Sequence, residues 1–304
     1  MFKSGYVSIV GKPNAGKSSL LNKLVGFKVA ITTPKPQTTR FNIKGIVTRK
    51  TSQIVFIDTP GVHMPKHKMG KYMMENVNCA INNVDVIVYL VDATRPKIDL
   101  ANENIMKNIA SLNTNVILCI NKIDKIEKQR ILTIIEQYNS FFKELGSEFK
   151  EIIPISVYKA DGVDELLLNI EKYLSEGEIL YPEDDITDIT QREIVEETIR
   201  EKALNNLDEE VPHGIKVEVE NFKEKTDKEG NDLFNIDVNI ICEKKSHKGI
   251  VIGKDGSMLK KITREARKDL ENNLEAKINL KVWVKVRENW QQNDIYLKNI
   301  KSKI

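Results

Sequence analysis

The sequence predicts an α/β protein in two parts, a doubly wound and mostly parallel sheet followed by a smaller α+β domain. Three observations support this prediction. Short β-prone runs alternate with helical patterns over about the first 175 residues. A glycine-rich motif, Gly11–Ser18, joins the first strand to the first helix, and the C-terminal third changes from acidic to basic. At 304 residues the chain is long enough for two domains, and we expect a first domain at 1–176, a linker at 177–190, a second domain at 191–290 and a tail at 291–304.

Composition excludes several classes of protein. The chain is 40% apolar and 30% charged with a net charge of +3, which is ordinary for a globular protein. Because the N-terminus enters a strand at once and no apolar run is long enough, we expect neither a signal peptide nor a transmembrane segment. Cys79, Cys119 and Cys242 are too few and too widely spaced for a disulfide framework or a zinc site, which fits a reducing cytosol.

The charge distribution is more informative than the net charge. An acidic segment at 181–242 precedes a basic one at 243–304. This asymmetry suggests that the C-terminal end meets an anionic partner, although a dipolar, solvated surface would produce the same pattern.

The first strand, Tyr6–Val10, leads into the phosphate-binding motif Gly-x-x-x-x-Gly-Lys-Ser, and a helix at 19–25 follows. Backbone N–H groups of such a loop, with the helix N-terminus, surround a phosphate chain. Lys17 would reach the β- and γ-phosphates, and Ser18 would place its hydroxyl on Mg²⁺. The predicted phosphate-loop residues are Gly11, Lys12, Pro13, Asn14, Ala15, Gly16, Lys17, Ser18 and Ser19.

Residues 31–40 contain two prolines and four threonines, and this composition predicts a loop. A second hydroxyl could reach the metal from here. Thr39 is the first choice and Thr38 the second. We also expect the loop to be mobile until nucleotide orders it.

Strands are predicted at 43–48 and 53–57, and the second ends in Asp58-Thr59-Pro60-Gly61. An acid at the carboxyl end of a buried strand lies at the crevice where open α/β sheets bind ligands. Asp58 would therefore hold Mg²⁺, and the backbone N–H of Gly61 would approach the γ-phosphate. Thr59 and Pro60 complete this predicted nucleotide-binding segment.

A buried strand at 115–120 ends in Asn121-Lys122-Ile123-Asp124. The Asp124 carboxylate can accept the N1–H and 2-amino groups of guanine, a pair of donors that adenine lacks. Lys122 would lie along the base and on the phosphate loop, and Asn121 would connect the two loops.

The remaining elements of the first half follow in order. Helices are expected within 62–83 and near 100–112, 127–145 and 164–174, with strands at 84–92 and 151–155. Backbone near Ser156 and Val157 would contact the guanine carbonyl.

The second half begins with a helix at about 190–207 and strands near 215–219 and 234–240. A Gly-x-x-Gly motif, Gly253–Gly256, then lies between an apolar run and a basic helix, and a strand at 278–286 ends the domain. A basic loop of this kind can clamp a nucleic-acid backbone, whereas the alternative is a solvated basic helix. The predicted RNA-contacting residues are Ile252, Gly253, Lys254, Asp255, Gly256, Lys260, Lys261 and Arg264. Trp283 and Trp290 would either stack on bases or pack in the fold.

Five motifs in this order resemble the GTPase superfamily: Gly11–Ser18, Thr38/Thr39, Asp58–Gly61, Asn121–Asp124 and Ser156. The second half resembles a KH domain of type II. Both halves together resemble the Era family over essentially the whole chain, with one departure, Val157 where the family usually has alanine. The resemblance implies a P-loop GTPase domain followed by a KH domain.

The resemblance implies GTP or GDP and Mg²⁺ as ligands, and Lys17, Thr39 and Gly61 as the catalytic groups. It also implies K⁺ at Asn14, as in related potassium-stimulated GTPases. Because Val62 stands where many GTPases carry a water-orienting glutamine, we expect slow hydrolysis that a partner accelerates.

The implied RNA partner is the 3′ end of 16S ribosomal RNA, and the implied role is assembly of the small (30S) ribosomal subunit. A monomeric, cytoplasmic protein that also associates peripherally with the inner face of the cell membrane is implied as well. Two alternatives stay open. One is an RNA-binding module with a structural nucleotide. The other is a GTPase in tRNA modification or membrane and cell-cycle signalling, which predicts a catalytic cysteine or a lipid-binding helix that the sequence does not show.

Overall fold

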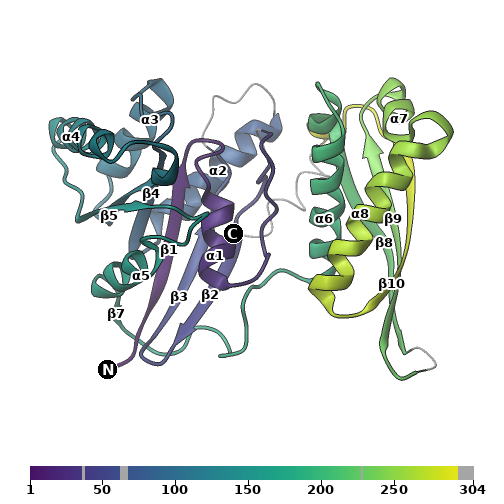
Figure 1. Cartoon of the computed structure of the whole chain (residues 1–304), viewed down its shortest axis with the longest axis horizontal. Helices are drawn as coiled ribbons and strands as arrows, with labels where there is room; N and C mark the ends of the chain where they lie inside the picture. Colours follow the sequence, from purple (N-terminus) through teal and green to yellow (C-terminus); the bar gives the residue numbers. More distant parts are fainter. Residues whose placement is uncertain (36–37, 62–67, 227–228, 294–304) are drawn as a thin grey trace. The chain divides into compact units, whose positions relative to one another are not determined.

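The computed structural model describes residues 1–35, 38–61, 68–226 and 229–293, which form two compact units (Figure 1). Unit 1 contains Met1–Ala30 and Thr39–Asp188. Unit 2 contains Ile31–Thr38 together with the described residues from Ile189 onward. A short loop from the first half of the sequence therefore belongs, by its contacts, to the second unit.

Unit 1 is built on a sheet with strand order β2-β3-β1-β4-β5-β6. Its strands are β1 (Lys3–Gly11), β2 (Ile43–Arg49), β3 (Ser52–Asp58), β4 (Val86–Asp92), β5 (Asn115–Asn121) and β6 (Glu151–Ile155). Neighbouring strands along this order are parallel, except that β2 runs antiparallel to β3. A two-residue strand, β7 (Ser175–Glu176), which the sequence did not predict, pairs antiparallel with β1. The predicted mostly parallel sheet is confirmed.

Helices cover both faces of this sheet, as the doubly wound prediction requires. They are α1 (Lys17–Val25), α2 (Lys68–Asn82), α3 (Leu100–Ala110), α4 (Lys128–Glu144) and α5 (Val163–Lys172). Side chains of α2, α3 and α4 share one buried cluster with β1, β4 and β5, whereas α1 and α5 lie in front of the sheet in Figure 1. The parallel strands end at one edge, so the loops that follow β1, β3 and β5 gather there.

The chain beyond β7 stays attached to unit 1. The backbone N–H groups of Leu180 and Tyr181 donate to Gln53 Oε1 at 2.7 and 2.9 Å. The N–H of Ile46 in β2 donates to the carbonyl of Ile186 at 2.9 Å. These contacts place residues up to Asp188, most of the expected linker, in unit 1.

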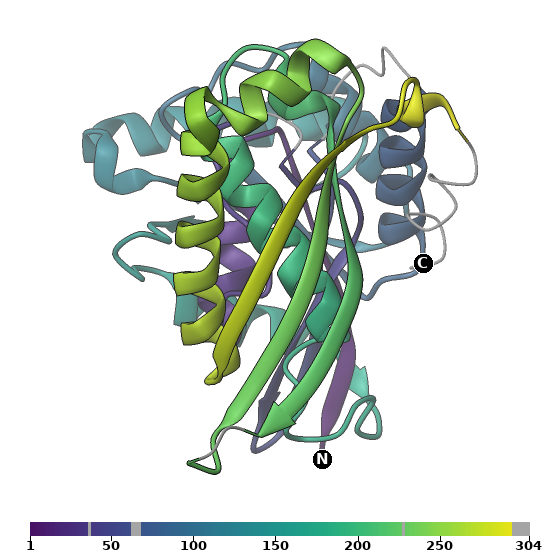
Figure 2. The ribbon, with the colours of Figure 1, turned by 90° about the vertical axis from the view of Figure 1, so that its right-hand side faces the viewer.

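Unit 2 contains three long strands and three helices among its described residues. The elements are α6 (Gln191–Asn206), β8 (Ile215–Thr226), β9 (Asp232–Cys242), α7 (Lys245–Ile252), α8 (Ser257–Leu274) and β10 (Lys277–Val286). The sheet order is β10-β9-β8, with β10 parallel and β8 antiparallel to β9 (Figure 2). A capping box formed by Thr190 and Glu193 begins α6.

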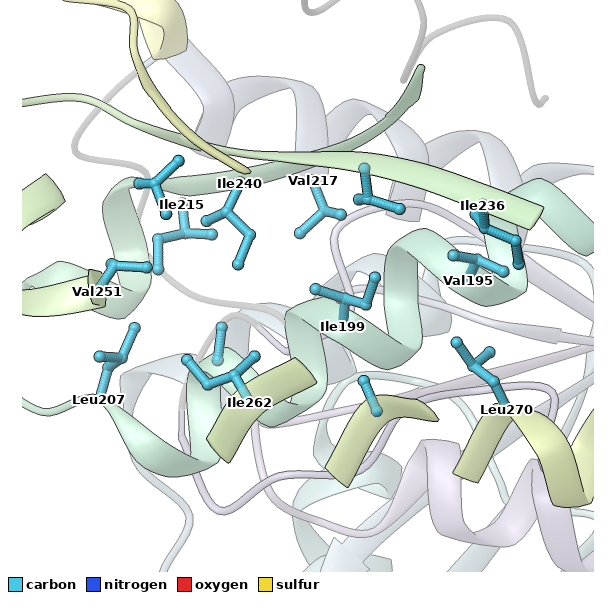
Figure 3. Close-up of a cluster of buried hydrophobic side chains, with 14 of the residues drawn as sticks. Val195, Ile199, Leu207, Ile215, Val217, Ile236, Ile240, Val251, Ile262 and Leu270 are labelled. Carbon is cyan, nitrogen blue, oxygen red and sulfur yellow. The ribbon is translucent and has the colours of Figure 1, made fainter. Parts of the chain in front are cut away.

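The core of unit 2 fills the space between this sheet and its helices (Figure 3). Helix α6 contributes Val195, Ile199 and Ala203, which are spaced four residues apart and therefore lie on one side of the helix. Strand β9 contributes Ile236 and Ile240, which lie on the same face because successive side chains of a strand point to opposite faces. This core confirms the predicted helix-first α+β arrangement.

The two tryptophans of unit 2 have different environments. Trp290 is 1% exposed, and its Nε1–H donates to the carbonyl of Gly214 at 3.0 Å, so it packs in the fold. Trp283 is 45% exposed on β10, and its side chain points to the face opposite that of Ile278 and Val284.

Candidate nucleotide site and basic groove

The phosphate loop connects β1 to α1 in unit 1. Gly16 caps the helix with a left-handed φ of 104°. A Cβ atom at Gly16 would lie 2.4 Å from Asn121 Nδ2, which donates to the carbonyl of Ala15 at 2.9 Å. Only glycine permits this close approach of the base-binding loop. The N–H groups that begin α1 are therefore presented at the edge of the sheet.

Lys17 is buried within this loop. Its ammonium donates to the carbonyls of Gly11 and Lys12 at 3.2 and 3.1 Å. Burial lowers the pKa of Lys17, and the nearby Asp58 carboxylate opposes that shift. The loop therefore holds a cation where the motif predicts that phosphates bind.

Ser18, Thr39 and Asp58 converge beside Lys17. Ser18 Oγ donates to Asp58 Oδ2 at 2.6 Å and lies 3.0 Å from Thr39 Oγ1, which is 3.4 Å from the same carboxylate oxygen. Asp58 Oδ1 is buried and has no hydrogen-bond partner among the described residues. Burial raises the pKa of Asp58 to about 6, although Lys17 lowers it. Hydroxyl and carboxylate oxygens are hard ligands, so the cluster fits Mg²⁺.

The structure distinguishes between the two candidate threonines. Thr38 Oγ1 donates to the carbonyl of Lys35 at 2.6 Å and lies 2.7 Å from Thr33 Oγ1. Its side chain is thus engaged within its own loop, and the Thr39 hydroxyl is the one beside Ser18 and Asp58.

The loop after β3 packs directly on the phosphate loop. Thr59 is fully buried, and its hydroxyl donates to the carbonyl of Ile9 at 2.8 Å. A Cβ at Gly61 would lie 2.8 Å from Cγ of Pro13, so glycine allows this contact. Pro60, which lies between Thr59 and Gly61 in the chain, is buried as well. Val62, which stands where many GTPases carry a water-orienting glutamine, lies outside the described residues.

Asn121 and Lys122 connect three loops at the strand ends. Asn121 Oδ1 accepts from the N–H of Val157 at 3.2 Å, while its Nδ2 donates to Ala15. The Lys122 ammonium donates to the carbonyl of Asn14 at 2.8 Å and to Asp92 Oδ2 at 2.6 Å. The structure thus brings the predicted base-binding residues onto the phosphate loop.

The role of the Ser156 side chain was not predicted from the sequence. Ser156 is buried, and its hydroxyl donates to Asp124 Oδ1 at 2.6 Å. This bond orients the half-buried carboxylate that would pair with guanine. No local sequence pattern predicts this hydrogen bond, because the two residues lie 32 positions apart and follow different strands.

The Gly-x-x-Gly motif of unit 2 forms a turn between α7 and α8. Gly253 and Gly256 both have left-handed φ values, 72° and 74°. Between them Lys254 and Asp255 are exposed, and Asp255 is itself left-handed. The turn presents its backbone and a lysine to solvent, as a backbone clamp requires.

A groove of about 320 Å³ runs between α8 and β10. It is lined by Leu259, Lys260, Thr263, Arg264, Arg267, Leu280 and Val282. Lys260 and Arg264 were predicted to contact RNA, whereas Lys261 lies outside this lining. The apolar residues were missed because they join the groove only when β10 lies beside α8. The cationic side chains can bind phosphates, and the apolar side chains beside them can contact bases.

The residues that the structure describes include no cluster of three or more histidine, cysteine or acidic side chains able to hold a metal. Over the same residues, every helix is too short or too polar to cross a bilayer. Cys119 and Cys242 are buried free thiols, and Cys79 is an exposed one.

Comparison with known proteins agrees with both units. A family model described as "50S ribosome-binding GTPase" matches residues 6–122, and a KH domain model matches residues 210–291. A protein named GTPase Era from Ruminiclostridium cellulolyticum is 47% identical over 300 residues, covering 98% of this chain and 97% of its own length.

Two solved structures align with the whole chain. One is a variant of Era from Aquifex aeolicus bound to GDP and aluminium fluoride, with a TM-score of 0.92, 40% identity and 100% coverage of both chains. The other is Era in complex with MgGDPNP and nucleotides 1506–1542 of 16S ribosomal RNA, with the same TM-score, identity and coverage. The motifs, the two folds and these full-length relatives lead to one assignment: this chain is a GTPase and belongs to the Era family.

Proposed function

We propose that the GTPase reaction of this protein uses a magnesium ion held by Ser18, Thr39 and Asp58. Three oxygen atoms within 3.4 Å of one another, one of them on a buried carboxylate, form a suitable ligand set. When bound there, the ion would neutralise charge on the β- and γ-phosphates. A relative was solved with MgGDPNP, which supports the proposal.

The chain's own groups would perform the remaining tasks. Lys17 and the N–H of Gly61 would stabilise negative charge that develops on the γ-phosphate, and Thr39 would close the site from the opposite side. Asp124, oriented by Ser156, would select guanine. Because hydrolysis needs an oriented water and Val62 cannot orient one, the intrinsic rate would be slow.

We also propose that Asn14 helps to hold a monovalent cation at the phosphates. Its carbonyl accepts from Lys122, which fixes this part of the loop. The test is the rate of GTP hydrolysis in potassium and in sodium at equal ionic strength. A faster rate in potassium is expected, and equal rates would refute this cation role.

For unit 2 we propose binding to the 3′ end of small-subunit ribosomal RNA, with a role in assembly of the 30S subunit. The observation that supports it most directly is the basic groove beside the exposed Gly253–Gly256 turn. KH folds hold about four unpaired nucleotides in such a groove. A relative was solved with nucleotides from the 3′ region of 16S ribosomal RNA.

The experiment measures affinity for a labelled single-stranded RNA with the sequence of the 16S 3′ end. Lys254→Asp keeps both glycines of the turn and reverses the charge that faces the backbone, so we expect affinity to fall about tenfold or more. The matched control is Lys281→Asp, which makes the same change on the opposite face of β10 from the groove.

Two results would refute the RNA assignment. One is equal binding to the 3′-end sequence and a scrambled sequence. The other is an equal loss of affinity in both lysine variants. Sedimentation of the protein with ribosomal subunits tests the assembly role, since co-migration with 50S rather than with 30S particles would favour a large-subunit partner.

The other properties implied by the resemblance are proposals of the same kind. We propose a cytoplasmic monomer that also associates peripherally with the inner face of the cell membrane. Light scattering tests the oligomeric state. Flotation with anionic lipid vesicles tests membrane association, and a protein that stays with the soluble fraction at low salt would contradict it.

A further inference from the structure

Strand β4 ends in an acidic residue, Asp92, to which the motifs of the nucleotide site assign no role. In the sheet β4 lies between β1 and β5, and these two strands carry the phosphate loop and the base-binding loop at their carboxyl ends. Asp92 is the register partner of Asn121, the first residue of the base-binding motif. The strand order therefore places one carboxylate between the two loops that would hold the nucleotide.

The two oxygen atoms of Asp92 have separate partners. Oδ1 accepts from the backbone N–H and the hydroxyl of Thr94 at 2.9 and 2.7 Å, which fixes the turn after the strand. Oδ2 accepts from the Lys122 ammonium at 2.6 Å. Asparagine or serine can form a turn of this kind, so the turn alone does not call for a carboxylate. The second oxygen is the one that distinguishes aspartate, and it faces Lys122.

The Lys122 side chain is held at both of its ends. Besides the bond to Asp92, its ammonium donates to the carbonyl of Asn14 in the phosphate loop at 2.8 Å. At the backbone, its N–H donates to Asn121 Oδ1 at 2.7 Å. A lysine stem is flexible and loses rotamer freedom when it is ordered. Fixing the ammonium therefore decides which course the stem takes between the two loops.

Burial protects the pair of Asp92 and Lys122 from water. Their side chains are 14% and 28% exposed. Burial alone would raise the pKa of Asp92, but the hydrogen bonds from Lys122 and Thr94 outweigh it, and the pKa is lowered. The carboxylate is therefore ionised at neutral pH, and the contact with Lys122 is a charge-assisted hydrogen bond that solvent screens only in part.

A second acid in the connection between β4 and α3 provides a comparison. Asp99 caps α3 by accepting from the N–H of Asn102 at 3.1 Å, and it pairs with Lys12 of the phosphate loop. The side chains of Asp99 and Lys12 are 45% and 31% exposed, so water screens this pair more strongly. The better protected of the two pairs is the one that holds the base-binding loop.

We propose that Asp92 is a positioning residue for the nucleotide site, which holds the Lys122 stem in the course against which the base packs. This inference rests on the role proposed for Lys122, whose stem would lie along the base and on the phosphate loop. Asp92 acts only through Lys122, whereas Asp124 would accept the donors that distinguish guanine. Loss of the Asp92 charge should therefore weaken nucleotide binding and leave the preference for guanine unchanged.

The test is a double-mutant cycle in the full-length protein, with fluorescently labelled GDP as the probe. Asp92→Asn keeps an acceptor oxygen for Thr94 and removes the charge that faces Lys122. We expect it to weaken GDP binding about tenfold, the effect of one charge-assisted hydrogen bond. In the Lys122→Met background, Asp92→Asn should no longer weaken GDP binding, because the partner is already absent.

The matched control is Asp99→Asn, which makes the same change in the same connection. Because Asp99 pairs with Lys12, any effect of this substitution should be equal in the wild-type and Lys122→Met backgrounds. Thermal unfolding without nucleotide verifies that each variant is folded. Competition of GDP with inosine diphosphate, which lacks the 2-amino group, measures the guanine preference.

The possible results separate this inference from the role on which it rests. If Lys122→Met weakens GDP binding, but Asp92→Asn has no effect or the same effect in both backgrounds, the positioning role is wrong and the role of Lys122 stands. If Lys122→Met leaves GDP affinity unchanged, the role of Lys122 is wrong, and the positioning role is refuted with it. A reduced guanine preference in Asp92→Asn would also overturn the proposal, since it would show an effect through the base-reading carboxylate.

Discussion

The nucleotide edge of unit 1 and the basic groove of unit 2 are built in opposite ways. At the nucleotide edge the polar groups are buried, with Lys17, Asp58 and Asn121 at 6%, 0% and 2% exposure. Lys17 is hydrogen-bonded within the phosphate loop, and Asp58 and Asn121 are hydrogen-bonded to that loop from other strand ends. In the groove the cationic side chains are exposed on α8, and apolar side chains of β10 line the groove beside them.

The two regions are therefore suited to different kinds of recognition. A buried polar site discriminates strongly, because a wrong ligand leaves its groups unpaired and desolvated. Exposed cations attract any nucleic-acid backbone, and salt screens them. We therefore expect a large preference for guanine over other bases. We expect the affinity for RNA to change in small steps when single cations are removed, and to depend on ionic strength.

The strongest effect should come from a substitution in the buried nucleotide site. Asp124→Asn replaces a carboxylate that accepts two donors with an amide that offers a donor in place of one acceptor. We expect affinity for GTP to fall by roughly 10⁴-fold and affinity for xanthosine triphosphate to rise, since xanthine presents a carbonyl there. Competition binding with the two nucleotides measures both changes.

The control for that experiment is Ser156→Ala, which leaves the carboxylate and removes only its 2.6 Å hydrogen bond. A loss of about fivefold in GTP affinity is expected from one such bond, with the preference for guanine retained. If Asp124→Asn kept the wild-type preference for guanine, the assignment of the base site would be wrong.

A smaller effect concerns pH and the buried Asp58. Its pKa is raised to about 6 because burial disfavours the ionised carboxylate. The stability of the metal-free protein should therefore decrease as the pH rises from about 4 through 6 and Asp58 becomes ionised. Mg²⁺ must displace the proton below that pKa, and apparent metal affinity should therefore fall about tenfold per pH unit below pH 6.

Thermal unfolding with and without Mg²⁺ at pH 5 and pH 7.5 measures this linkage. Stabilisation by the same Mg²⁺ concentration should be larger at pH 7.5. Equal stabilisation at both pH values would show that Asp58 does not change protonation when the metal binds. The Asp58→Asn variant, which cannot titrate, should show no such dependence.

A substitution in the exposed groove should have the weakest effect of the three. Arg267→Gln removes one cation from the groove and should lower RNA affinity only a few-fold at moderate salt. The slope of log affinity against log salt should decrease by about one, whichever RNA sequence is bound. Lys281→Gln, on the other face of β10, provides the matched measurement. Equal slopes for the wild type and Arg267→Gln would place the RNA elsewhere on the unit.

Much of the fold could be predicted because its signals are local. The helix expected at 127–145 is observed at Lys128–Glu144, and the strand expected at 278–286 begins one residue earlier. The two-residue period of a strand and the 3.6-residue period of a helix depend on residues close together in the chain, so both can be detected in the sequence. β7 was missed because a two-residue strand has no period to detect.

The nucleotide residues could also be predicted as a set, because each motif lies at a strand end and parallel strands end at one edge. The Ser156 hydroxyl on Asp124 and the lining from β10 could not, since both depend on pairs of elements that meet only in the folded chain. The same holds for the attachment of residues up to Asp188 to unit 1 through Gln53.

From the sequence we could predict which chemical groups this protein carries and in what order: a phosphate loop, an acid proposed to hold a metal ion, a carboxylate proposed to select guanine, and a basic turn. The folded chain was needed to show that Thr39 and not Thr38 faces Ser18 and that Ile31–Thr38 contacts α6. The reason is physical. Local propensity depends on residues a few positions apart, whereas the two adjacent hydroxyls are distinguished by contacts with Ser18 and Asp58, which lie 21 and 19 positions from Thr39 in the chain.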